Sequence, residues 1–323
     1  MITESSFKPA WWLPSAHLQT ILAKYLKKSQ HVSLLTQTLD TPDGDFIDIA
    51  WTEIPNSKST KPIVVILHGL AGSADSHYAK GMLDQIKRKG WIGALMHFRG
   101  CSGRPNRMAQ SYHSGDTRDI RFFSEWLAAQ YPNAPRAAMG FSLGGNVLTK
   151  YLAEAPDSGY KAGAVICAPL DLTSCSHRIG KGSSKIYQKY LVDMLKEATF
   201  EKIEQSLLPD ICPQKLADVT KLWDFDHMVT APINGFDSAA HYYQQASGKP
   251  VMKEIKQPCL FIHAADDPFL DHQHIVPSEP LPKHLTFEVS TKGGHVGFVS
   301  GKNPFKPEYW LEQRVPEFFE QHL

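Results

Sequence analysis

The sequence predicts an α/β fold built on a mostly parallel central sheet, and three observations lead to this class. Short apolar runs rich in β-branched residues recur along the chain, at 62–69, 91–100, 136–142, 162–169 and 258–267. Stretches of helical period separate several of these runs. The runs are continuously apolar rather than alternating, as expected of strands that helices cover on both faces. An open sheet with helices on each side follows.

The composition is that of a globular chain. Of the 323 residues, 42% are hydrophobic and 21% are charged, which excludes disordered and collagen-like classes. The 34 Lys and Arg residues balance 33 Asp and Glu residues, so we expect no nucleic-acid partner. Five cysteines without a CxxC pair predict reduced thiols and no metal site. The lack of a signal-like start or a membrane-spanning apolar run favours a cytoplasmic protein.

Local patterns define elements before and between these strands. Residues 32–53 contain two β-like runs joined by turn residues at 42–45, which predicts an antiparallel hairpin at the sheet edge. Apolar residues at helical spacing predict helices over 78–89 and 116–130. Both helices would cross over between neighbouring parallel strands.

A long insertion interrupts the alternation of strands and helices. About ninety residues separate Pro169 from Pro258, several times more than a crossover requires. We therefore predict a helical cap inserted after the sixth strand. The expected division is an α/β core of 1–169 and 251–323, which includes an N-terminal arm of 1–30, and a cap of 170–250.

The N-terminal arm contains an amphipathic stretch over 15–28. Its apolar stripe, Leu18, Ile21, Leu22, Tyr25 and Leu26, lies beside the basic residues Lys24, Lys27 and Lys28. Such a helix either packs on the core with a solvated basic edge or rests weakly on an anionic membrane surface. The sequence favours packing and leaves membrane contact open.

The sharpest local signal is the run Gly140-Phe141-Ser142-Leu143-Gly144. It follows the strand 136–142 directly and precedes a helix-like run, and no second complete GxSxG occurs. This context is typical of a nucleophile elbow, a tight turn that holds a serine in strained backbone geometry. Glycines are needed on either side because side chains there would collide with the neighbouring elements. Ser142 is the candidate nucleophile.

A serine hydroxyl needs a base to take its proton and an acid to orient that base. In sheets that carry a nucleophile elbow, the chain order is serine, then acid, then histidine. Asp267 follows the strand at 258–264, and His295 lies in a glycine-rich loop after the next β-like run. We assign Ser142 as nucleophile, His295 as general base and acid, and Asp267 as the orienting carboxylate.

Two other carboxylates compete with Asp267. Asp266 is its neighbour, and we interpret it as a turn residue that binds local backbone N–H groups. Asp171 follows the strand 162–169, where an acid could also reach the histidine, but it is better placed to cap the first turn of the insertion.

An acyl-transfer site also needs backbone N–H groups that stabilise a developing oxyanion. The loop His68-Gly69-Leu70-Ala71-Gly72 directly follows a strand, and residue 143 begins the helix after the elbow. We predict that the N–H groups of Leu70 and Leu143 form the oxyanion hole. The alternative for the first loop is an ordinary glycine-rich connection.

A buried ion pair is expected near the pocket mouth. Arg99 leaves the strand 91–100 in a loop, and Asp116 and Asp119 lie close to the start of the following helix. We predict that Arg99 pairs with one of these two carboxylates as a structural contact rather than with a substrate.

Taken together, the motifs HGLAGS, MHFRGCSG, NRMAQSYHSGDTRD, GFSLGGN, HAADDPF and GGHVGF resemble those of a known family. The segments LPSAHLQT, YQKYL and FDHMVTA extend the similarity over nearly the whole chain. The chain is similar to the bacterial YheT-like esterases of the α/β-hydrolase superfamily, subfamily four. The resemblance implies an α/β-hydrolase fold, a charge relay of Ser142, Asp267 and His295, and carboxylic-ester hydrolysis without a cofactor.

The expected function is hydrolysis of a small-molecule acyl ester through an acyl-enzyme. Aromatic residues and methionines in the insertion favour an apolar acyl group. One alternative is a serine-dependent acyltransferase, which would use the same residues with an alcohol as acceptor. The alternative from another class is a non-catalytic binding protein whose cap is the partner surface.

Overall fold

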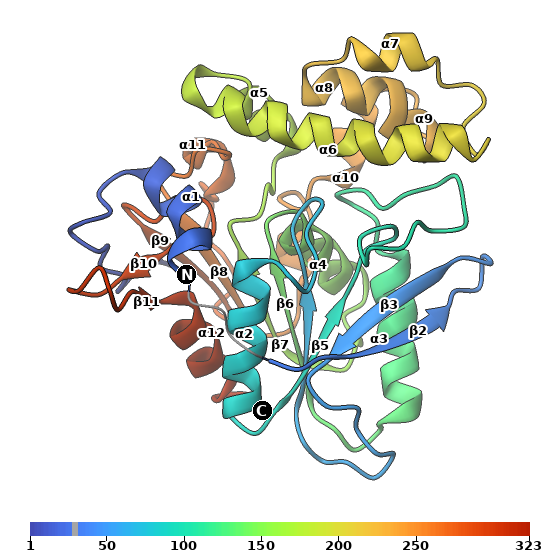
Figure 1. Ribbon diagram of the computed structural model, residues 1–323. Helices are drawn as coiled ribbons and strands as arrows, with labels where there is room; N and C mark the ends of the chain where they lie inside the picture. Colours follow the sequence, from blue (N-terminus) through green and yellow to red (C-terminus); the bar gives the residue numbers. More distant parts are fainter. Residues whose placement is uncertain (28–31) are drawn as a thin grey trace.

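A nine-stranded sheet runs through the computed structural model, which describes residues 1–27 and 32–323 (Figure 1). Its strands lie in the order β1, β9, β8, β7, β6, β4, β5, β3, β2. Their bounds are β1 Ile2–Glu4, β2 Leu35–Asp40, β3 Phe46–Trp51, β4 Ile63–Leu67, β5 Ile92–Met96, β6 Arg136–Phe141, β7 Tyr160–Ile166, β8 Cys259–Ala264 and β9 Leu285–Ser290. Neighbours are parallel except β2 with β3 and β3 with β5. The predicted α/β class is confirmed.

The edge hairpin is confirmed, with β2 and β3 paired from Leu35 opposite Trp51 to Asp40 opposite Phe46. The other edge holds β1, which pairs in parallel with β9. The sequence predicts no strand there, because three residues are too few to show a strand period. With β1 counted, the inserted helices follow the seventh strand, not the sixth.

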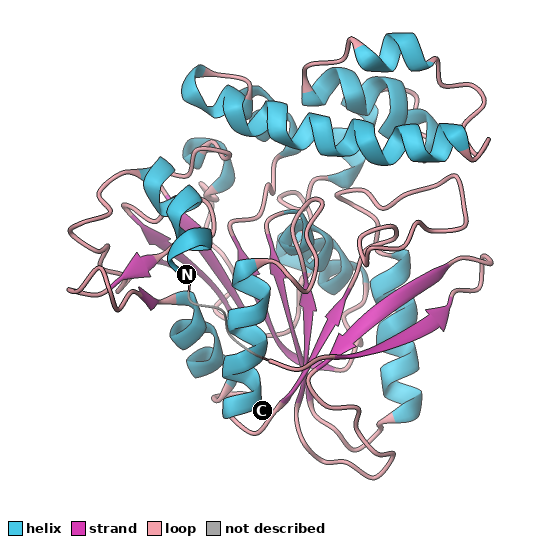
Figure 2. Cartoon of the chain, in the orientation of Figure 1, coloured by secondary structure: helices cyan, strands magenta, loops and turns pink. Residues whose placement is uncertain are grey.

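Helices cover both faces of the sheet (Figure 2). Helices α2 (His77–Arg88) and α12 (Leu311–Phe319) contact each other on one face, and α3 (Arg118–Gln130) and α4 (Leu143–Glu154) contact each other on the other. Every residue of β4 and β5 is buried between these layers. This double covering explains why the central strands are apolar without alternation.

The residues between β7 and β8 form a helical layer over the carboxyl ends of the strands (Figure 1). It contains α5 Leu172–Ile179, α6 Lys185–Glu204, α7 Pro213–Ala217, α8 Leu222–Phe225, a π-helical turn Asp226–Thr230, α9 Ala231–Ile233 and α10 Ala239–Ala246. The short helix α11 (His272–Ile275) follows β8. Part of this layer has an apolar cluster of its own, around Val192, Leu216 and Phe225. The boundaries expected at 169/170 and 250/251 stay predictions.

The N-terminal helix α1 (Ala16–Leu26) packs with part of its predicted stripe. Leu22 and Leu26 pack against a small cluster that includes Leu13 and Val299. Leu18, Ile21 and Tyr25 are exposed instead. Lys28 lies outside the described residues, as does the end of the expected arm of 1–30.

Among the helices described, none is long and apolar enough to cross a membrane. The short strands β10 (Val299–Ser300) and β11 (Glu308–Tyr309) form a separate antiparallel pair. The expected cytoplasmic location stays a prediction.

Arg99 ties the edge hairpin to the body of the sheet. Its guanidinium donates to Asp119 from Nε at 2.9 Å and from Nη2 at 2.6 Å, and Nη1 donates to Asp43 in the hairpin turn at 2.7 Å. Of the two carboxylates predicted from the sequence, Arg99 therefore pairs with Asp119. Asp116 instead accepts from Arg118, at 2.8 Å.

Arg99→Met should lower the free energy of unfolding by about 3–5 kcal/mol, because it leaves buried carboxylates without their cation. Urea denaturation followed by tryptophan fluorescence measures this loss. Arg107→Met is the matched control, because that arginine is half-exposed in its pair with Asp40 and should cost less than about 1 kcal/mol. Equal losses in the two variants would contradict the assigned role of Arg99.

Candidate active site

Ser142 occupies a strained turn between β6 and α4. Its backbone has φ 50° and ψ −121°, and its N–H donates to the carbonyl of Ile166 at 2.8 Å. A Cβ on Gly144 would lie 2.4 Å from the carbonyl oxygen of His68, and a Cβ on Gly140 would lie 2.3 Å from the carbonyl oxygen of Gly144. Both positions therefore need glycine, which is what lets the serine stand at the tip of the turn.

The structure brings the three predicted side chains together. The distance from His295 Nε2 to Ser142 Oγ is 2.9 Å, and that from His295 Nδ1 to Asp267 Oδ2 is 2.8 Å. With a proton on Nδ1, the imidazole donates to Asp267 and its Nε2 can accept from the serine hydroxyl. The Phe269 ring stacks on the imidazole, with 4.0 Å between ring centroids. The ring of His295 is thus fixed by hydrogen bonds at both nitrogens and by stacking on one face.

Asp267 is buried, and its second oxygen accepts from the N–H of Phe269 at 2.8 Å. Asp266 accepts instead from the N–H of Gly294 at 3.0 Å, so it supports the loop that carries His295. Asp171 caps α5 through the N–H of Ser174. Of the three carboxylates considered from the sequence, Asp267 is the one hydrogen-bonded to His295.

Helix α1 holds the His295 loop from outside, a contact that no sequence pattern predicted. Thr20 Oγ1 accepts from the N–H of His295 at 2.9 Å. A Cβ on Gly294 would lie 2.5 Å from the carbonyl oxygen of Ala16, and one on Gly297 would lie 2.4 Å from that of Gln19. The glycines around His295 signal a close backbone approach in the sequence, but they do not say which segment approaches.

The candidate oxyanion donors lie on either side of Ser142. In the loop after β4, the N–H groups of residues 69 and 71 donate to the hydroxyls of Tyr78 at 2.9 Å and Tyr112 at 2.7 Å. No hydrogen-bond acceptor is found among the described residues for the N–H of Leu70 between them, or for that of Leu143 in the first turn of α4. Both residues line the cavity with Ser142. The two tyrosine hydroxyls thus bind the N–H groups of residues 69 and 71, and the N–H of Leu70 is left available to a ligand.

The cavity above Ser142 has a volume of about 320 Å³ and lies between the core and the inserted helices. Its walls from the inserted helices are mainly apolar, with Leu172, Ile179, Leu191, Met194 and Leu222 among the residues that line it. Such a cavity suits an apolar group placed against a small number of polar ones.

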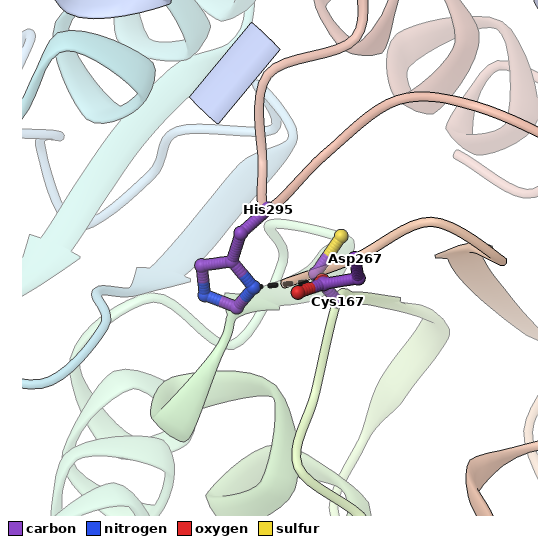
Figure 3. A group of neighbouring side chains, drawn as sticks. All are labelled: Cys167, Asp267 and His295. Atoms are coloured by element: carbon purple, nitrogen blue, oxygen red, sulfur yellow. Dashed lines mark hydrogen bonds and ion pairs between the residues drawn. The ribbon is translucent and has the colours of Figure 1, made fainter. Parts of the chain in front are cut away.

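The Cys167 thiol lies beside Asp267 and His295 (Figure 3). Its sulfur, an Asp267 oxygen and a His295 nitrogen lie within 4.8 Å of one another. Burial, and then the charge of Asp267, raise the pKa of the Cys167 thiol well above its ordinary value. Both ring nitrogens of His295 are already hydrogen-bonded, to Asp267 and Ser142, so these residues fit a hydrogen-bonded cluster better than a metal site.

Known proteins resemble this chain over most of its length. A family model described as alpha/beta hydrolase fold matches residues 62–302. The Escherichia coli (strain K12) protein "Putative esterase YheT" is 41% identical over 325 residues, covering 99% of this chain and 95% of that relative. Human phospholipase ABHD3 is 24% identical over 96% of this chain and 77% of its own. The solved Pyrococcus furiosus esterase Pf2001 shares the fold with TM-score 0.53 at 17% identity, over 90% of this chain and 93% of that chain.

Thr20→Val should slow the labelling of Ser142 by a fluorophosphonate about tenfold, because the N–H of His295 loses its acceptor and the loop shifts. Mass spectrometry of samples quenched over time measures the labelling rate. Thr20→Ser keeps the hydroxyl and is the matched control. Equal rates for the two variants would show that the contact from α1 does not position the histidine.

Proposed function

The chain belongs to the α/β-hydrolase fold family, and we propose that it is a serine carboxylic-ester hydrolase with Ser142 as nucleophile, His295 as general base and acid, and Asp267 as orienting carboxylate. The observation that carries the proposal is the pair of hydrogen bonds that join these side chains at 2.9 and 2.8 Å. Relatives named as an esterase and a phospholipase support the same reaction class.

The proposed reaction has two half-reactions. His295 Nε2 takes the proton of Ser142 as Oγ attacks the ester carbonyl, and the N–H groups of Leu70 and Leu143 stabilise the oxyanion. The intermediate collapses to an acyl-enzyme, and His295 gives the proton to the departing alcohol. Water, deprotonated by His295, then attacks the acyl-enzyme and releases a carboxylic acid and free Ser142.

The apolar walls of the cavity support an ester with an apolar acyl part. Transfer of the acyl group to an alcohol would use the same residues and differ only in the second half-reaction. Product analysis with and without added methanol separates the two: a hydrolase gives mainly the free acid at low methanol concentration, whereas a transferase gives mainly the methyl ester.

Ser142→Ala should leave the fold intact and lower the turnover of a p-nitrophenyl ester on the order of 10⁶-fold, by analogy with serine proteases. Steady-state release of nitrophenolate measures the loss. Ser57→Ala, at an exposed serine in the loop before β4, is the control and should keep full activity. Turnover by Ser142→Ala at the parent rate would remove the proposed nucleophile and revive a non-catalytic binding role.

We also propose that the chain contacts anionic membrane surfaces through a rim patch made of Leu18, Ile21 and Tyr25 of α1 and Ile186 and Tyr190 of α6. These side chains are exposed. Hydrogen bonds from His17 to Tyr187 and Ser183 join the two segments beside the cavity that Tyr190 lines. The exposed lysines Lys24 and Lys185 supply the charge that anionic lipid attracts.

Ile21→Glu should lower binding to phosphatidylglycerol-containing vesicles about tenfold, because it removes one apolar side chain that the bilayer would bury on binding. Co-sedimentation measures the bound fraction, with pure phosphatidylcholine vesicles as the comparison. Ile54→Glu is the matched control, since Ile21 and Ile54 are both 43% exposed and Ile54 lies outside the rim patch. Binding that is equal in both variants would overturn the contact.

A further inference from the structure

A buried carboxylate lines the candidate active site from the side of the inserted helices. Asp226 is 7% exposed and lines the same cavity as Ser142. It begins the π-helical turn Asp226–Thr230, a backbone form that is rare and frequently lies at functional sites. The proposed hydrolysis makes no use of this residue.

The hydrogen-bond partners of this carboxylate are neutral hydroxyls. Tyr243 donates its hydroxyl to Asp226 Oδ2 at 2.6 Å, and Thr230 donates to Oδ1 at 2.7 Å. No salt bridge to Asp226 is found among the described residues. Burial raises the pKa of Asp226 from 3.8 to about 6, so the group is still mainly ionised at neutral pH. A carboxylate can accept about four hydrogen bonds, so Asp226 keeps free acceptor positions.

A second polar group lies beside the cavity. Ser176 of α5 is 7% exposed and lines the cavity, and no hydrogen-bond partner is found for its Oγ in the described part of the chain. Tyr243 lines the cavity as well. Buried hydroxyls almost always find a partner, so an unpaired one in a ligand cavity points to a ligand that supplies it. We call Asp226, Tyr243 and Ser176 the polar cap site.

We propose that the polar cap site binds a hydroxyl group of the substrate, so that the enzyme selects acyl esters that carry a hydroxyl away from the scissile bond. A hydroxyl can donate to Asp226 and accept from Ser176 at once, which satisfies both groups. An ammonium group could donate to Asp226 but has no acceptor to offer the Ser176 hydroxyl. This inference rests on the proposed ester hydrolysis at Ser142, and it adds the substrate class.

The test compares p-nitrophenyl esters of matched chain length that end in a methyl, a hydroxyl or an ammonium group, over a series of lengths. The quantity measured is the ratio of kcat/KM for the hydroxyl ester to that for the methyl ester. Asp226→Asn should lower this ratio at least about tenfold, and Ser176→Ala should lower it several-fold, because each removes one hydrogen bond to the hydroxyl. Asp224→Asn is the matched control, at an exposed position two residues away that does not line the cavity, and should keep the ratio.

The outcomes separate this inference from the proposed function. Loss of all ester hydrolysis in the parent chain would refute the catalytic role of Ser142. Hydrolysis without preference for the hydroxyl ester at any length, or a preference unchanged in Ser176→Ala and Asp226→Asn, would overturn the polar cap site alone. A stronger preference for the ammonium ester would overturn the choice of a hydroxyl.

The melting temperature of Asp226→Asn gives a second readout. A purely structural role for Asp226 would lower this temperature, whereas the proposed role predicts a rise. Folding raises the pKa of Asp226. The contribution of Asp226 to the free energy of unfolding is therefore fully present below pH 3.8 and is lost as the pH rises through about 6. Asp226→Asn should therefore melt at a higher temperature than the parent near pH 8, with the difference shrinking towards pH 4. A lower melting temperature near pH 8 would assign Asp226 to the scaffold and overturn the inference.

Discussion

The hydrogen bonding of one imidazole constrains the whole arrangement. His295 must reach Ser142 and Asp267 at 2.9 and 2.8 Å with different nitrogens, which fixes its tautomer and its orientation. The three residues follow β6, β8 and β9, and β7 lies between β6 and β8. Parallel strands bring their carboxyl ends to the same edge of a sheet, so residues remote in sequence meet there. The strand order is therefore what makes the proposed relay possible.

Close backbone packing helps to hold the loops of the site. Gly144 lies against the end of β4, and Gly294 and Gly297 lie against α1. Ser142 and Cys167 have backbone φ angles of 50° and 48°, which residues other than glycine rarely adopt. Such strain persists where the surrounding core determines the backbone, and here buried strands lie directly behind both residues. The inserted helices close the site above and add the polar cap site to an apolar wall.

The sequence predicted what is encoded locally. Continuous apolar runs indicated the central strands, turn residues indicated the β2–β3 hairpin, and the glycines around Ser142 indicated the elbow. The strand β1 was missed because its three residues pair with β9 near the other end of the chain. The same reason hid Thr20, which meets His295 across 275 positions. The burial of Asp226 depends on its tertiary neighbours, which include Tyr243 of α10. Some apolar residues of α1 are packed and others are exposed, and this depends on what the helix contacts. A helical period predicts an apolar face but not its neighbours.

A crystal structure of the chain after reaction with a fluorophosphonate tests the proposed relay most directly, because the phosphorus stands in for the tetrahedral carbon of ester hydrolysis. We expect density continuous from Ser142 Oγ, with one phosphoryl oxygen about 2.7–3.1 Å from the backbone nitrogens of Leu70 and Leu143. We also expect His295 to remain hydrogen-bonded to Asp267. Phosphorus attached to another residue, or a phosphoryl oxygen turned away from both nitrogens, would refute the relay.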